Sequence, residues 1–114
     1  MKNNLIDFDS VYGSEFKRYL TAREVIDNNL MGTYKVVDVE LVEIEDTEGT
    51  KKRIALHLEG LEDYILALNV TNANIVARKW GKDISKWKGK QLELKTTKVG
   101  FKGKIVDGIL VEPK

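Results

Sequence analysis

Positively charged side chains gather in two short stretches of this sequence, each beside a turn. The cations are Lys51, Lys52 and Arg53 in the first stretch, and Lys98, Lys102 and Lys104 in the second. Lysine and arginine neutralise phosphates and release counterions, so such contacts weaken as salt rises. Phe101 lies in the second stretch, in a glycine-bearing loop where a large apolar ring is unexpected, and an exposed ring can stack on a base. These residues, with His57 as a second stacking surface, form a predicted nucleic-acid-binding set.

Each member of the set also has a simpler interpretation. Lysines are common on hairpins because they keep strands soluble and discourage edge pairing. The ring of Phe101 can instead fold back over the core, and His57 can be a surface side chain with no special role. Together, the six cations and one ring on two loops are stronger evidence for binding than any one of these residues is alone.

Catalysis finds little support in the sequence. The chain has no cysteine and a single histidine, which excludes thiol chemistry, disulfides and histidine-rich metal sites. No glycine-rich phosphate loop precedes a helix. The acidic run from Glu43 to Glu48 lacks the ligand spacing of a calcium loop, and we interpret it as a solvated turn. We therefore expect no enzymatic activity, no cofactor and no metal.

Length and charge set further bounds. A chain of 114 residues makes one domain. The net charge is only +1, but residues 1–63 carry 8 basic against 14 acidic side chains, and residues 64–114 carry 11 against 4. Such asymmetry favours an anionic partner for the basic half, unless the two halves neutralise each other in the fold. With no apolar run of membrane-spanning length and no signal-like start, we expect a cytoplasmic protein with no membrane partner.

Alternating apolar residues predict five strands from Thr33 onward. They cover about 33–44, 53–59, 64–68, 91–99 and 105–111. In the first strand the alternation slips between Leu41 and Val42, which predicts a bulge or strong bend. Between the third and fourth strands, Ala73, Val76, Ala77 and Trp80 repeat at helical spacing. We expect Thr71 or Asn72 to cap this helix, Gly81 to end it, and Asp83 to cap a further turn.

This order of elements predicts a mainly β fold, a five-stranded OB-fold-like barrel with one helix between strands 3 and 4. An open α+β sheet is the alternative. We expect residues 1–32 to form an N-terminal arm of one or two short helices, starting at Ser14 and at the capping box of Thr21 and Glu24, or else an irregular arm. Residues 33–114 form the barrel domain. We expect Trp80 and Trp87 to be core residues, with the surrounding lysines as their solvated face.

Four stretches resemble a family of small, largely uncharacterised phage and prophage proteins. They are YLTAREV (19–25), the segment from Tyr64 to Ala73 that contains LNVTNA, the segment from Trp80 to Leu94 that contains W-x-GK, and the ending from Val99 to Pro113. The resemblance covers about residues 19–113 and implies phage or prophage origin and a role in DNA metabolism. This chain departs from the family pattern at Leu110, where the family tends to carry arginine, and at Trp80, where it tends to carry tyrosine.

The sequence thus favours a non-sequence-specific module that binds single-stranded DNA, alongside phage or host replication or recombination proteins. The alternative is a protein-interaction module with no nucleic-acid binding. Near-zero net charge and apolar residues in the arm, among them Phe8, Val11, Tyr12 and Phe16, favour that alternative.

Overall fold

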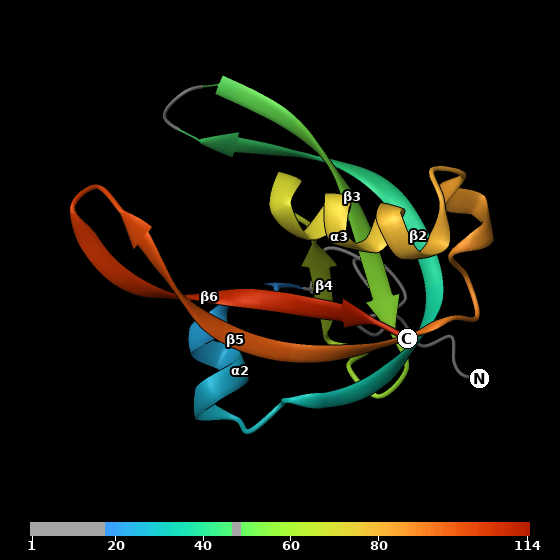
Figure 1. Cartoon of the computed structure of the whole chain (residues 1–114), viewed down its shortest axis with the longest axis horizontal. Coiled ribbons are helices and arrows are strands. Elements are labelled where there is room, and N and C mark those ends of the chain that lie inside the picture. The colour runs from blue at the N-terminus through green and yellow to red at the C-terminus, as the bar shows by residue number, and fades with distance from the viewer. Residues whose placement is uncertain (1–17, 47–48) are drawn as a thin grey trace, which may run out of the picture.

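A computed structural model describes residues 18–46 and 49–114 (Figure 1). In this part of the chain six strands and two α-helices follow one another, with a short 3₁₀ helix before the fifth strand. In chain order they are β1 (Arg18–Tyr19), α2 (Ala22–Asp27), β2 (Gly32–Asp46), β3 (Gly49–Leu58), β4 (Tyr64–Ala67), α3 (Val70–Trp80), η2 (Ile84–Lys86), β5 (Gln91–Phe101) and β6 (Lys104–Pro113).

The strands form one mixed sheet in the order β1-β4-β3-β2-β5-β6. All neighbours are antiparallel except β1 and β4, which run parallel. The sheet curls into a barrel-like half-cylinder, as Figure 1 shows. The prediction of a mainly β, barrel-like fold is confirmed, but the number of strands is wrong. The sheet has six strands because Arg18 and Tyr19 add a short one at the β4 edge.

The long first strand of the predicted barrel is β2, and it bends where its register slips. Val36 lies opposite Leu58, but Asp38 lies opposite His57, so Val37 is the extra residue of a bulge. The slip therefore lies four residues before the predicted position. As a result Val36 and Val39 share the core face, while Leu41 continues that face beyond the core and is exposed.

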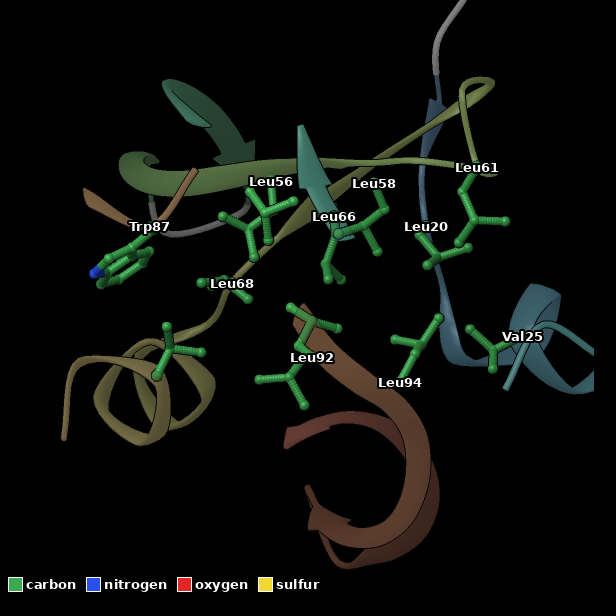
Figure 2. Packing of buried hydrophobic residues seen from close by; sticks show 13 residues of the cluster. Leu20, Val25, Leu56, Leu58, Leu61, Leu66, Leu68, Trp87, Leu92 and Leu94 are labelled. Atoms are coloured by element: carbon green, nitrogen blue, oxygen red, sulfur yellow. The ribbon is translucent and has the colours of Figure 1, made fainter. Parts of the chain in front are cut away.

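The core lies inside the curl and is built mainly from leucines of the strands and of the segments next to them (Figure 2). Its largest buried side chain is Trp87, of which 1% is exposed. The indole of Trp87 donates a hydrogen bond to the carbonyl oxygen of Gly81 at 2.9 Å, and its ring meets that of Trp80 edge-on at 6.0 Å. The core assignment of Trp87 is confirmed, and Trp80 packs against the same core.

The described part of the N-terminal arm joins this core. Leu20 and Val25 are buried in the same cluster as the barrel leucines, and Figure 2 shows Val25 beside Leu94. The capping box of Thr21 and Glu24 begins α2 as predicted. The helix predicted from Ser14 to Leu20 is wrong in its last residues, because Arg18 and Tyr19 pair with β4; the remainder lies outside the described residues.

Helix α3 follows the fourth of six strands, so its predicted place between strands 3 and 4 is also wrong by this count. The helix begins earlier than predicted, because the side chain of Asn69 is the cap and accepts from the backbone of Asn72. Gly81 ends α3, and Asp83 caps η2, both as predicted. None of the helices in the described ranges is long and apolar enough to cross a bilayer.

The side chain of Asn72 joins α3 to the edge of the sheet. Its amide nitrogen donates to the carbonyl oxygen of Ile109 at 2.9 Å, and its oxygen accepts from the backbone N–H of Val111 at 3.1 Å. Asn72 thereby pairs with β6 as a neighbouring strand would. With 4% of its surface exposed, it is buried, and both ends of its amide are satisfied.

Replacement of Asn72 should therefore destabilise the fold. In Asn72→Ala the two backbone groups of β6 lose their partners, at a cost of about 1–3 kcal/mol for each group left unpaired. Urea unfolding measures this loss. The matched control is Asn74→Ala on the exposed side of the same helix, which should change stability by less than about 0.5 kcal/mol. Equal midpoints for the two variants would contradict this role.

Val25 offers a second test of the fold. If the arm completes the core, Val25→Ala should cost roughly 1–3 kcal/mol through reduced burial and the cavity left behind. Its neighbour Ile26 is exposed, and Ile26→Ala should have a much smaller effect on thermal or urea unfolding. An effect of Val25→Ala no larger than that of Ile26→Ala would show that α2 contributes little to folding.

Candidate nucleic-acid interface

Two long hairpins extend from the core toward the same end of the molecule. They are β2–β3 and β5–β6; the end of β2, the start of β3 and the turn between β5 and β6 all lie at the left in Figure 1. The β5–β6 turn is Lys102-Gly103, whose residues have φ angles of +51° and +78°. Two consecutive left-handed residues make the tight turn typical of β-hairpins. Both predicted cation-bearing stretches therefore lie on hairpins that share one end of the fold.

The first stretch lies within β3, and its side chains divide between the two faces of the hairpin. Side chains alternate along a strand, and Leu56 faces the core, so Lys52 lies on the inner face. Lys51, Arg53 and His57 lie on the outer face. The structure does not bring these four predicted residues to one surface.

The two outer-face residues nearest the core have partners. The imidazole Nε2 of His57 contacts the carboxylate of Glu40, which stands across from Ala55 on the neighbouring strand. The guanidinium of Arg53 donates to the carbonyl oxygen of Lys52 at 3.0 Å. His57 is half-buried and engaged by Glu40, so its predicted role as a stacking surface gains no support from its position.

Lys98 lies on the inner face of β5, two residues before the loop in which it was predicted to act. Its Nζ donates to Asp107 Oδ1 on β6 at 2.6 Å. This pair is exposed, and an exposed ion pair of this type contributes little to stability. It does, however, offset the charge that Lys98 would offer a phosphate.

The tip of the β5–β6 hairpin is the part of the predicted site that the structure assembles. Phe101 ends β5 with 58% of its surface exposed, so the ring does not fold back over the core. Lys102 Nζ lies 5.3 Å from the centre of that ring, and Lys104 stands opposite Phe101 in the strand register. An exposed ring with two exposed cations beside it combines stacking with charge attraction.

Carboxylates limit the positive charge elsewhere on the hairpins. Glu43 stands opposite Lys52 and shares its inner face with Glu45. At the base of β5–β6, Lys95 pairs with Glu112 at 3.0 Å, and this hydrogen bond lowers the pKa of the Glu112 carboxyl. Within the two hairpins, the positive charge is therefore offset least at the β5–β6 tip.

Two apolar side chains outside the predicted binding set are exposed on the inner faces. Leu41 is 65% exposed on β2, and Ile105 is 73% exposed on β6. Both fit the alternating pattern of apolar strand residues, which does not distinguish a buried position from an exposed one. They are exposed because the hairpins extend beyond the body of the sheet, and only the length of the hairpins distinguishes them from core residues.

A pocket of about 460 Å³ lies between α2 and β6, lined by Arg23, Ile26, Asp27, Val106 and Asp107. Its charged groups are already paired, since Arg23 contacts Asp27 at 3.2 Å and Asp107 holds Lys98. In the described residues no three acidic or imidazole side chains stand close enough to share a metal ion.

Comparisons with protein-family models, with curated proteins and with solved structures gave no match for this chain.

Proposed function

We propose that this protein binds single-stranded DNA without sequence preference, through an OB-fold-like barrel and without catalysis. The observation that supports this best is the tip of the β5–β6 hairpin, where Phe101 is exposed with Lys102 over its ring and Lys104 across from it. The ring supplies a surface for a base, and the two ammonium groups supply charge for the neighbouring phosphates.

The arrangement of strands is consistent with this assignment. Strands β2 to β6, with α3 after the third of them, follow the order of an OB barrel, which can be partly open. In that fold, oligonucleotides lie between the loop joining the first two strands and the loop joining the last two. Here the strands next to those loops, the end of β2 with the start of β3 and the end of β5 with the start of β6, extend toward the same end of the molecule (Figure 1).

The DNA strand is proposed to contact Phe101 first, on the outer face of the β5–β6 tip, and to pass around that tip toward Lys52 on the inner face of β3. Glu43 and Glu45 border that path and make the contact at β2–β3 weaker than the contact at the tip. The resemblance to phage and prophage proteins supports a role for this activity in phage DNA metabolism, with replication or recombination proteins as partners.

A second candidate is protein interaction, and the exposure of Leu41 and Ile105 favours it. Apolar side chains on the inner faces of two hairpins can pack against a partner protein. The two functions differ in their response to salt, because apolar contacts between proteins do not release counterions as phosphate contacts do.

Phe101 carries the most direct test of the stacking contact. Phe101→Ala should weaken binding to a labelled oligothymidylate by about 1–3 kcal/mol, because the base loses its platform. Phe101→Trp is the matched control and should keep the affinity, since it keeps an aromatic face. Fluorescence anisotropy at low salt measures both variants. Absence of binding by the unaltered protein at low salt would overturn the proposed function.

The charge contacts are tested by salt dependence. Lys52→Ala combined with Lys102→Ala should lower the slope of log affinity against log salt by about 0.7 for each phosphate that the protein no longer neutralises. Arg23→Ala combined with Lys95→Ala removes the same charge from cations that already have carboxylate partners, so the slope should be nearly unchanged. Equal changes for the two pairs would show that net charge, and not the hairpins, governs binding.

A further inference from the structure

The end of the molecule opposite the hairpins carries the densest positive charge in the sequence. The connection from the end of α3 through η2 to β5, residues 78–90, holds six cations and one carboxylate in 13 residues, in a chain whose total charge is +1. The cations are Arg78, Lys79, Lys82, Lys86, Lys88 and Lys90. We call this segment the basic cap. It lies at the right of Figure 1, in orange, on the side away from the end of β2 and the β5–β6 turn.

The cations of the basic cap are exposed and have no carboxylate partners among the described residues. The one carboxylate of the segment, Asp83, is exposed and is hydrogen-bonded to Ser85 and not to a cation. Its Oδ1 accepts from the hydroxyl of Ser85 at 2.6 Å and from the N–H of Ser85 at 3.2 Å. The cap differs in this respect from the hairpins, where Lys98 is paired with Asp107.

The basic cap is held in one shape by the core. Trp87 is buried at its centre, and its indole hydrogen bond to Gly81 ties the two ends of the turn together. The backbone of the cap also pairs with β2. The N–H of Gly89 donates to the carbonyl oxygen of Val36 at 2.8 Å, and the N–H of Val36 donates to the carbonyl oxygen of Lys90 at 2.8 Å. The charges therefore project from a rigid platform, and binding does not require the backbone to be ordered first.

The chemistry of the cap favours one class of anionic partner. None of its large apolar side chains is exposed, since Trp87 is buried and Trp80 and Ile84 pack against the core. Surfaces that insert into a membrane interface carry exposed aromatic or aliphatic residues. The centres of protein interfaces are depleted in lysine. Uniform positive charge without a stacking ring matches the phosphate backbone of nucleic acid.

We propose that the basic cap is a second nucleic-acid contact surface, which binds the phosphate backbone of single or double strands alike. It is independent of the hairpin site, because it has no ring to stack on an unpaired base. A duplex has the higher charge density and should release more counterions per neutralised phosphate than a single strand.

The test uses the full chain and a labelled DNA duplex, titrated by fluorescence anisotropy over a range of salt concentrations. The test variant combines Lys82→Ala, Lys86→Ala and Lys88→Ala. Each neutralised phosphate of a duplex contributes about 0.9 to the slope of log affinity against log salt, so the loss of three contacts should lower that slope by roughly 2–3. The matched control is Lys82→Arg, Lys86→Arg, Lys88→Arg, which keeps the charge and should keep the slope. Thermal unfolding of both variants verifies that the fold is unchanged.

Two results would overturn the proposal: an unchanged slope in the alanine variant, or binding of the unaltered protein to phosphatidylserine vesicles with none to the duplex. The hairpin site is tested separately, since Phe101→Ala should leave duplex binding intact. If duplex binding depends on the cap but Phe101→Ala does not change the affinity for single-stranded DNA, this inference stands and the proposed single-strand function is wrong.

Discussion

The fold depends on how the backbone groups at the two edges of an open sheet are covered. Strands β1 and β6 are the edges of the curled sheet. At β6 the amide of Asn72 takes the place of a neighbouring strand and pairs with the backbone on either side of Leu110. A single side chain thus joins the last strand to α3, and its burial makes the interaction costly to break.

The N-terminal segment supports the same sheet at its other edge. By pairing with β4, β1 covers an edge that would otherwise present unpaired backbone groups. The chain then enters α2, which places Val25 against the inner leucines. The curled sheet is therefore completed by elements before and after it in the chain, and its hairpins are left free to extend from one end.

The two ends of the molecule differ in their charge chemistry. At the hairpins, cations stand among carboxylates, and an aromatic ring is exposed at one tip. At the basic cap, cations stand without carboxylate partners, and the aromatic rings are turned into the core. The arrangement at the basic cap follows from core packing, because Trp87 and Trp80 fill the core at the end where the sheet and α3 meet. The lysines between them have only the surface to occupy.

The sequence by itself determined the strands, the hairpins, Gly81 as the end of α3 and the burial of Trp87, because alternation, helical spacing and turn residues act locally. It did not determine β1, whose two residues form a strand only because the edge of β4 is beside them. Local pattern did not reveal that β3 begins at Gly49, so that Lys51 and Lys52 lie within the strand and on opposite faces of it. It also did not reveal that Asp107 meets Lys98, because that contact depends on the register between β5 and β6. Only the tertiary structure decided which cations remain without carboxylate partners, because a charge is neutralised by neighbours in space and not by neighbours in the chain.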